Sequence, residues 1–265
     1  MLNIISWNTF LAPGMYKRIL RIRIIKKMIK KMSNKTDVFL FQELNAFYSG
    51  FVFFYINNLL NLLHINEIFP KVASIVEYLM IIEGYIIPYK LIDCGKDIID
   101  LCNDLGYTHT HCIHNEGRII SAGLLICSKY EIHYRHTIKL EGDSIHCPGI
   151  IGIKIYVNNR YINIYNIHLC PTLDNITVSY KFVNYLNKLY KLTPELNRYN
   201  SILKIKSMLC EDDTPYIIGG DFNININSDE INKYKLLLNN HTVKCDFNYT
   251  HIESENDSKK FIDYF

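Results

Sequence analysis

Hydrophobic and polar positions along this chain repeat with two different periods, which separates its expected strands from its expected helices. Short apolar runs that indicate strands occupy residues 2–8, 37–42 and 216–218. The run at 37–42 is apolar almost throughout, so we expect a buried strand there. Residues 15–32 instead repeat apolar positions at helical spacing, which places Leu20, Ile24 and Met28 on one side of a helix, with Ile22, Ile25 and Ile29 nearby.

The middle of the chain predicts strands joined as hairpins. Strands are expected at residues 108–114, 119–128, 131–140, 150–157 and 161–169. Asn158-Asn159 between the last two is typical of a tight turn, because asparagine tolerates positive φ. Further helices are expected at 97–105, 178–190, 195–209 and 229–239, and a last strand at 261–265. Hairpins flanked by helices predict an α/β (α+β) fold of two packed mixed sheets with helices outside.

Residues 44–92 are the least regular part of the sequence. Apolar runs at 51–65 and 75–87 are expected to be helical, with breaks at Pro70, Gly84 and Pro88. Three interpretations stay open: a subdomain that covers the core, a lid that binds a partner, or a surface that contacts a membrane. The first is favoured, because aromatic and apolar residues more often belong to a core than to an interface.

Composition narrows the class of protein. The chain has 265 residues, of which 49% are hydrophobic and 21% charged, so it suits one large folded domain and not a disordered chain. A net charge of +3 permits an anionic partner without requiring one. The cysteines form no C-x-x-C pair, no signal peptide opens the sequence, and no apolar run reaches the ~18 residues of a membrane span. We therefore expect a soluble intracellular protein with reduced thiols.

The expected helix at 15–32 carries a strongly basic side. This side suits an anionic lipid surface or a phosphate backbone, although the solvated outer face of a surface helix is the favoured interpretation. Its basic residues are Lys17, Arg18, Arg21, Arg23, Lys26, Lys27, Lys30 and Lys31.

Polar residues at strand ends are the candidates for chemistry. Glu43 follows a buried strand, where a carboxylate is out of place unless it is hydrogen-bonded or binds a cation. Asp221 and Asn223 follow Gly219-Gly220, which allow a tight turn and a close approach to a ligand. If the strand persists, both side chains point the same way: the carboxylate can orient or deprotonate a water, and the amide can donate to a phosphate oxygen. An ordinary Gly-Asp turn after a strand is the alternative.

Two histidines, His109 and His111, share one face of an expected strand. They are candidate metal ligands, but no third ligand stands at a useful spacing. A strand surface is therefore the favoured interpretation for this pair.

Six short motifs in a fixed order resemble the endonuclease/exonuclease/phosphatase superfamily, which includes DNase-I-like nucleases and neutral sphingomyelinases. They are SWN (6–8), FQE (41–43), AGLLICSKYEI (122–132), NIHL (166–169), GGDFN (219–223) and IDYF (262–265). The resemblance covers nearly the whole chain except residues 44–92. It implies a four-layer, DNase-I-like sandwich formed by a single domain over residues 1–265, with an insertion at about 44–92.

The resemblance also implies a metal site and a catalytic set. Glu43 is the expected main ligand of Mg²⁺, with Mn²⁺ as an alternative, and Asn8 is expected close by, holding a metal-bound water or the phosphate. These two residues form the expected metal site.

On the second set of motifs, the resemblance assigns Asp221 to orient the attacking water and Asn223 to bind a phosphoryl oxygen. It assigns His168 to donate to the phosphate or leaving group, and Asn166 of the same motif to substrate binding. Asp263 is expected to orient a catalytic histidine.

One expected motif is missing. Members of the family carry a Ser-Asp-His stretch on a last strand beyond the IDYF motif, and this sequence ends at Phe265 without it. Either the sequence is part of a longer gene product, or the natural protein is shortened and lacks that strand and the principal acid–base histidine. A truncated active member is favoured, but the missing Asp-His leaves the activity of this chain in doubt.

Four details look more like the neutral sphingomyelinases than the nucleases: FLAP (10–13), GLLICSKYEI (123–132), PGIIGIKI (148–155) and HLCP (168–171). The first hypothesis is therefore cleavage of sphingomyelin in the manner of a phospholipase C, with peripheral contact with a membrane. A DNA or RNA nuclease of the same superfamily is the alternative, and a catalytically impaired phosphate- or lipid-binding module is the third hypothesis. No obligate protein partner is expected.

Overall fold

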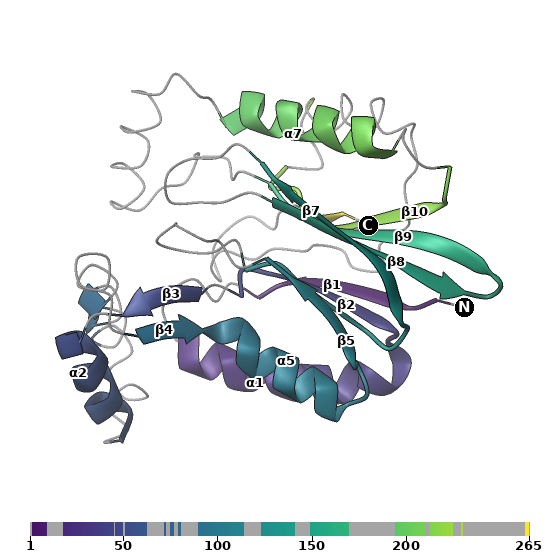
Figure 1. Ribbon diagram of the computed structural model, residues 1–265. Coiled ribbons are helices and arrows are strands. Elements are labelled where there is room, and N and C mark those ends of the chain that lie inside the picture. The colour runs from purple at the N-terminus through teal and green to yellow at the C-terminus, as the bar shows by residue number, and fades with distance from the viewer. Residues whose placement is uncertain are drawn as a thin grey trace. The chain divides into compact units, whose positions relative to one another are not determined.

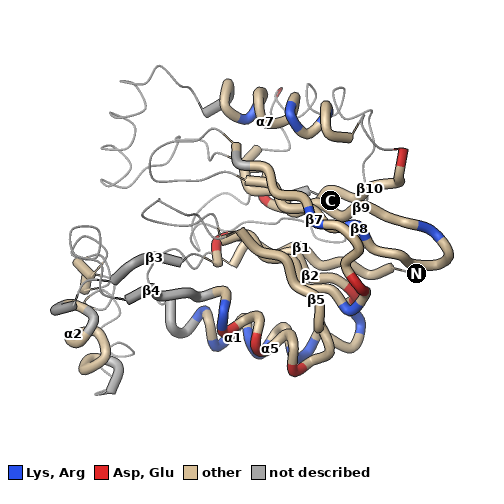
Figure 2. The backbone as a smooth tube through the Cα atoms, viewed as in Figure 1, with Lys and Arg blue, Asp and Glu red and all other residues tan. Residues whose placement is uncertain are grey.

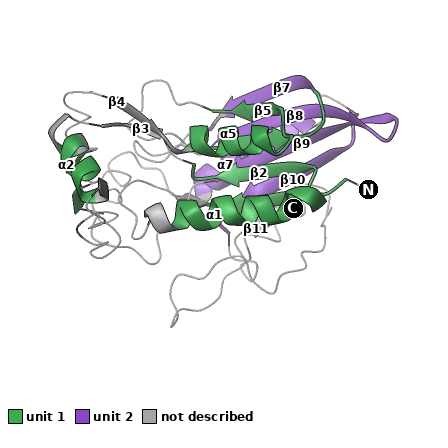
Figure 3. Ribbon diagram, turned by 90° about the horizontal axis from the view of Figure 1, so that it is seen from below, with its two compact units in different colours: residues 1–131 green, residues 132–265 purple. Residues whose placement is uncertain are grey.

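The computed structural model describes two compact units, residues 1–131 and 132–265, and each unit is considered by itself (Figure 3). The described residues are 2–9, 18–44, 46–49, 51–62, 72, 75–76, 79–80, 90–113, 123–140, 149–169, 194–209, 213–224, 229 and 263–264. The expected helix at 178–190 and nearly all of the one at 229–239 lie outside them, as does most of the one at 75–87. That both units belong to a single domain stays a prediction.

A mixed four-stranded sheet forms the centre of the first unit. Its order is β1-β2-β6-β5, from β1 (Ile4–Asn8), β2 (Val38–Gln42), β5 (His109–Cys112) and β6 (Leu125–Ser128). β1 and β2 are parallel, and the other pairs are antiparallel. Every residue of β2 is buried, as the apolar run predicts. His109 and His111 are half-buried on β5.

Two helices, α1 (Arg18–Met32) and α5 (Cys94–Asp104), pack on one face of this sheet (Figure 1). Ile25 and Ile29 of α1 are buried, whereas Ile24 is 50% exposed. The sequence prediction, which put Ile24 on the apolar side of the helix, is wrong at this position. Residues 22, 25 and 29 form a second apolar stripe of equally good helical spacing, and this is the stripe that packs on the sheet.

Helix α5 ends at a glycine and leads into a buried tyrosine. Gly106 has φ +89, and the Tyr107 amide donates to the Cys102 carbonyl at 2.9 Å, a usual way to end a helix. The Tyr107 hydroxyl donates to the Thr36 carbonyl at 2.8 Å and to the Ser33 carbonyl at 3.1 Å, in and just after the short 3-10 helix η1 (Ser33–Lys35) that precedes β2. Tyr107 therefore ties the end of α5 to the start of β2.

The insertion expected at 44–92 contributes a strand pair and a helix. β3 (Ala46–Ser49) and β4 (Lys90–Asp93) are antiparallel, and α2 (Phe51–Leu62) follows β3. The expected helix at 51–65 is confirmed over α2. Among the described residues, no helix is both long enough and apolar enough to cross a bilayer.

The second unit is built on a mixed five-stranded sheet of order β11-β10-β9-β8-β7. Its strands are β7 (Ile132–Lys139), β8 (Gly149–Val157), β9 (Arg160–His168), β10 (Tyr216–Asp221) and β11 (Asp263–Tyr264). β9 and β10 are parallel and the rest antiparallel. The tight turn expected at Asn158-Asn159 is confirmed, with φ of 50 and 62. Helix α7 (Pro194–Leu209) packs on this sheet through Ile202 and Ile205.

Gly220 allows a close approach between two strands, and the approach to a ligand that the sequence predicts there stays a prediction. It lies within β10 at φ +138, and a Cβ there would overlap the backbone of Ile167 on β9. The close approach that this glycine permits is therefore between neighbouring strands. It brings the ends of β9 and β10 together.

Candidate active site

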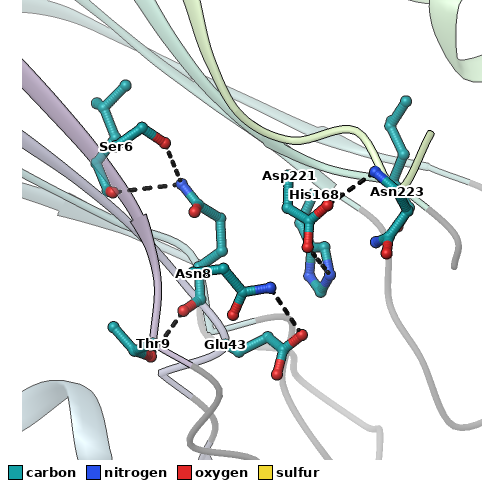
Figure 4. A network of polar contacts seen from close by, with 10 residues as sticks. Ser6, Asn8, Thr9, Glu43, His168, Asp221 and Asn223 are labelled. Atoms are coloured by element: carbon teal, nitrogen blue, oxygen red, sulfur yellow. Dashed lines mark hydrogen bonds and ion pairs between the residues drawn. The ribbon is translucent and has the colours of Figure 1, made fainter. Parts of the chain in front are cut away.

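In the first unit, Glu43 stands at the carboxyl end of β2 in an unusual backbone conformation. Its φ is 59, a left-handed value that glutamate rarely adopts. The next amide, of Leu44, donates to the Gly123 carbonyl at 3.0 Å, which holds the chain in this turn. Asn8 at the end of the parallel strand β1 donates from Nδ2 to Glu43 Oε1 at 3.0 Å (Figure 4). The two residues expected to form a metal site thus hydrogen-bond to each other.

A buried polar network lies beside this pair. Gln42 is fully buried, and its Nε2 donates to Ser6 Oγ at 3.1 Å and to the Leu40 carbonyl at 3.3 Å. Both the amide and the hydroxyl of Thr9 donate to the Gln42 carbonyl (Figure 4). The network joins the ends of β1 and β2 and so positions Asn8 and Glu43. No role was expected for Ser6, Thr9 or Gln42, although a glutamine at the end of an apolar strand was a visible signal.

Arg21 is a fourth residue for which no role at the site was expected, because the sequence placed it only among the basic residues of its helix. It lies on α1 and is half-buried. Burial lowers the pKa of the Arg21 guanidinium, and the negative charge of Glu43 acts in the opposite direction. The electrostatic interaction between Arg21 and Glu43 could not be foreseen, because basic residues occur throughout α1 and only packing brings one of them near the carboxylate.

In the second unit, His168 and Asp221 occupy paired positions on parallel strands. They are partners in the register of β9 and β10, and His168 Nε2 lies 3.9 Å from Asp221 Oδ2 (Figure 4). This distance is too long for a direct hydrogen bond. The Asp221 side chain is 1% exposed and that of His168 13%, so both groups are largely shielded from solvent.

Asn223 closes a turn on Asp221. β10 ends at Asp221, and the Asn223 amide donates to Asp221 Oδ1 at 2.7 Å, with Asn223 at φ 52. Its Nδ2 donates to the Leu169 carbonyl at 2.7 Å, and the Leu169 amide donates to the Asp221 carbonyl at 2.9 Å. The strand does not continue through Asn223, because the Asp221 side chain accepts a hydrogen bond from the Asn223 amide and the backbone turns there. One oxygen of Asp221 is thereby fixed, and the other lies on the side of His168.

The other two predicted site residues, Asn166 and Asp263, are placed by their positions on strands. Asn166 lies within β9 and is fully buried. Asp263 lies on β11, where it pairs with Asp221 in an antiparallel register. Substrate binding by Asn166 and orientation of a histidine by Asp263 stay predictions.

Each unit therefore gathers a distinct set of groups at the ends of its strands. In the first unit, the carboxylate of Glu43 and the amide of Asn8 are a hydrogen-bonded pair, and a carboxylate is the oxygen ligand that Mg²⁺ prefers. In the second, a shielded carboxylate lies near an imidazole, an arrangement suited to proton transfer. The carboxylate of Glu43 and the amide oxygen of Asn8 are ligands that fit a hard divalent cation.

Comparison with known proteins agrees with this chemistry. Residues 5–265 match the Endonuclease/Exonuclease/phosphatase family, and the chain belongs to that family. Members of this superfamily are hydrolases that act on phosphodiesters. No curated protein matches the sequence.

Solved structures share the fold at low sequence identity. A β-hairpin deletion mutant of beta toxin from Staphylococcus aureus is 14% identical, with a TM-score of 0.64 over 100% of this chain and 85% of that one. Sphingomyelinase C from Streptomyces griseocarneus is 12% identical, with a TM-score of 0.62 over 99% and 82%. A mutant of the same Staphylococcus aureus toxin with bound magnesium ions is 14% identical, with a TM-score of 0.59 over 98% and 81%. The predicted DNase-I-like fold class is confirmed.

Proposed function

We propose that this protein is a metal-dependent phosphodiester hydrolase that cleaves sphingomyelin in the manner of a phospholipase C. The observation that carries the proposal is the pairing of His168 with Asp221 at the ends of parallel strands, in a family match that covers both units. Asn8 and Glu43 supply the groups that the same reaction needs for a cation.

Glu43 is the proposed ligand of Mg²⁺, and a bound cation would withdraw electron density from a phosphoryl oxygen. Asn8 holds the Glu43 carboxylate in place through its hydrogen bond to Oε1. The left-handed backbone at Glu43 fits this role, because strained conformations of non-glycine residues concentrate at functional sites. Ser6, Thr9 and Gln42 act as positioning residues behind the pair.

The proposed reaction begins when Asp221 accepts a proton from a water molecule. The water oxygen forms a bond to phosphorus, and the bond between phosphorus and the lipid oxygen breaks. His168 donates a hydrogen bond to the phosphoryl group as negative charge develops, and the leaving oxygen takes a proton from solvent to yield the lipid alcohol. Asn223 fixes the Asp221 carboxylate through its backbone amide, so that the other oxygen is available to the water.

A lipid substrate is supported by the neighbours that share the fold. One of them is named a sphingomyelinase C, and the sequence motifs at 123–132 and 148–155 also resemble that branch. These likenesses favour a sphingolipid without identifying its headgroup. The function is therefore tested by offering substrates directly.

The experiment offers the purified chain sphingomyelin vesicles and abasic-site DNA with Mg²⁺ and measures products of both. Release of phosphocholine that is lost in Asp221→Asn and Glu43→Gln supports the proposal. Asp229→Asn serves as a matched control, because it removes a carboxylate that is exposed on the surface. Release of phosphocholine that survives in Asp221→Asn would contradict the catalytic assignment.

A nuclease is the second candidate, and one observation favours it. Tyr134, Tyr156 and Tyr161 are exposed on neighbouring strands β7, β8 and β9, with Lys154 beside them in the register. Exposed aromatic rings next to basic groups suit the stacking of single-stranded bases. Cleavage of DNA without release of phosphocholine in the same assay would select this candidate. Absence of both products would favour the third hypothesis, a catalytically impaired phosphate- or lipid-binding module.

A further inference from the structure

Exposed aromatic rings gather on one face of the five-stranded sheet of the second unit. On the described strands β7, β8 and β9, every large exposed apolar side chain is a tyrosine: Tyr134, Tyr156 and Tyr161, between 46% and 57% exposed. In the register, Tyr156 pairs with Tyr161, and Tyr134 pairs with Lys154, two residues before Tyr156 on β8. Paired residues and residues two apart share a face of a sheet, so these four side chains lie on one face. This surface is called the aromatic face below.

A β-bulge adds a histidine ring to the aromatic face. The register of β7 and β8 shifts between Ile132 and Tyr134, so His133 is an extra residue on β7. The centroid of the His133 ring lies 5.4 Å from that of Tyr161, which in turn lies 5.0 Å from that of Tyr156. Two successive residues of β7 therefore both contribute rings to the same face.

A buried tyrosine supports the rings from below. Tyr165 on β9 is buried, and its ring occupies the space where a Cβ at Gly152 of β8 would stand. The centroid of this ring lies 5.9 Å from that of His136, and the His136 ring lies 4.4 Å from the Tyr134 ring. Rings that are held by their neighbours before a ligand arrives lose little conformational freedom on binding. The aromatic face is therefore suited to receive flat groups.

The strands that carry the aromatic face contain basic residues and no acidic one. Their basic residues are Arg135, Lys139, Lys154 and Arg160. Lys154 lies among the tyrosines, and Figure 2 shows positive charge at the β8–β9 turn, where Arg160 begins β9. The charge of these strands is thus complementary to an anionic ligand.

The aromatic face is separate from the pair formed by His168 and Asp221. Tyr161 and His168 stand at opposite ends of β9, seven residues apart, which is roughly 23 Å along a strand. The register of β8 and β9 is unbroken, and an odd separation on a regular strand points two side chains to opposite faces of the sheet. A ligand on the aromatic face would therefore be bound away from these two catalytic candidates.

We propose that the aromatic face binds single-stranded nucleic acid, with bases stacked on Tyr134, Tyr156 and Tyr161 and a phosphate contacted by Lys154. Every base has a flat face that can stack on an aromatic ring, and a basic group beside the rings attracts the backbone. A duplex keeps its bases stacked inside, so it cannot use the rings. A bilayer is disfavoured, because the described parts of these strands expose no large aliphatic side chain. Binding here goes beyond the proposed hydrolysis and does not depend on which phosphodiester is cleaved.

The test is fluorescence anisotropy of a labelled oligothymidylate of about 12 nucleotides, titrated with the full chain and a chelator so that no metal-dependent cleavage occurs. Tyr156→Ala is expected to weaken binding at least about fivefold, the usual loss when one base loses its ring. Tyr156→Phe keeps the ring and is expected to bind as the unchanged protein does. Lys154→Gln is expected to reduce the slope of log K against log salt by about 0.7, the value for one phosphate contact of a single strand.

Tyr199→Ala and Lys27→Gln are the matched controls. Tyr199 is an exposed tyrosine of α7, and Lys27 is an exposed lysine of α1. Both variants are expected to bind the oligonucleotide as the unchanged protein does. Binding that is lost in Lys27→Gln and kept in Tyr156→Ala would overturn the proposal, because it would then be electrostatic and located on α1.

Three further outcomes would also overturn the proposal. They are no binding of the oligothymidylate, equal binding of a DNA duplex of the same length, and tighter binding to phosphatidylserine vesicles that is lost in Tyr156→Ala. The last would assign the aromatic face to a lipid surface. Release of phosphocholine plays no part in this measurement, so its result is independent of the proposed function.

Discussion

His168 and Asp221 are register partners on parallel strands, and His168 Nε2 lies 3.9 Å from Asp221 Oδ2. Each residue comes from a different motif, and the sheet alone determines their separation. Parallel neighbouring strands have their carboxyl ends at the same edge of the sheet. His168 at the end of β9 and Asp221 at the end of β10 therefore lie close together.

Asp221→Asn is expected to separate catalysis from structure. The asparagine keeps an oxygen for the Asn223 amide, so the turn is retained, but it cannot accept a proton from water. Turnover is expected to fall by about 10²- to 10⁴-fold, the usual contribution of a general base. Thermal unfolding is expected to be unchanged in this variant. Asp221→Ala loses the turn as well, and it is expected to be less stable by about 1–3 kcal/mol.

Glu43→Gly is expected to be more stable than Glu43→Ala. The backbone at residue 43 is left-handed, a conformation that costs about 1–2 kcal/mol for a residue with a Cβ and nothing for glycine. Urea unfolding of the two variants measures this difference, which is expected to be about 1 kcal/mol. Both variants are expected to lose metal-dependent activity. Equal stability of the two would show that the left-handed turn is not retained once the carboxylate is removed.

Gly220→Ala is expected to lower the free energy of unfolding more than Gly106→Ala does. Its Cβ would overlap the Ile167 backbone, and β9 and β10 would have to separate. Gly106→Ala is the matched control, because it also has positive φ but no atom lies near its added Cβ. Gly106→Ala is expected to cost about 1 kcal/mol, and Gly220→Ala clearly more in the same urea experiment. A similar cost for both would contradict the close approach of the strands.

Tyr107 is expected to make the protein lose stability in alkali. Burial raises the pKa of its hydroxyl, so the folded state keeps the proton after the unfolded state has lost it. The contribution of the protonated Tyr107 hydroxyl to the free energy of unfolding is complete below about pH 10. It falls as pH rises above that value, by about 1.4 kcal/mol per pH unit. Urea unfolding from pH 8 upward, at about one-unit steps, measures this slope.

Tyr107→Phe provides the comparison. It is expected to be less stable near neutral pH by about 1–3 kcal/mol, because the carbonyls of Thr36 and Ser33 lose a donor. Its alkaline slope is expected to be shallower than that of the unchanged protein. Some slope remains, because burial also raises the pKa of the Cys127 thiol. An unchanged slope in Tyr107→Phe would show that the hydroxyl is not the group responsible.

Much of the fold could be predicted because the apolar runs are strong. β2 is buried at every position, and β8 and β9 join at two asparagines that tolerate positive φ. The choice of stripe on α1 could not be predicted, since residues 24 and 25 both continue an apolar pattern and only packing on the sheet selects Ile25. Strand ends were the least certain, as the early end of β10 at Asp221 shows.

The residues of the candidate site could be predicted, but the hydrogen bonds and charges that position them could not. Asn8, Glu43, His168 and Asp221 stand in recognisable motifs at strand ends. The contact of Asn223 with the Leu169 carbonyl could not be foreseen, because it joins an asparagine to a backbone atom just beyond the end of β9. The same holds for the approach of Arg21 to Glu43.

The register of β9 and β10 has a consequence for how this chain can be altered. His168 and Asp221 are aligned by hydrogen bonds between the strands, so the chain that connects those strands does not set their alignment. A change in the length of this connection outside α7, whose Ile202 and Ile205 pack on the sheet, is therefore expected to leave the pair aligned.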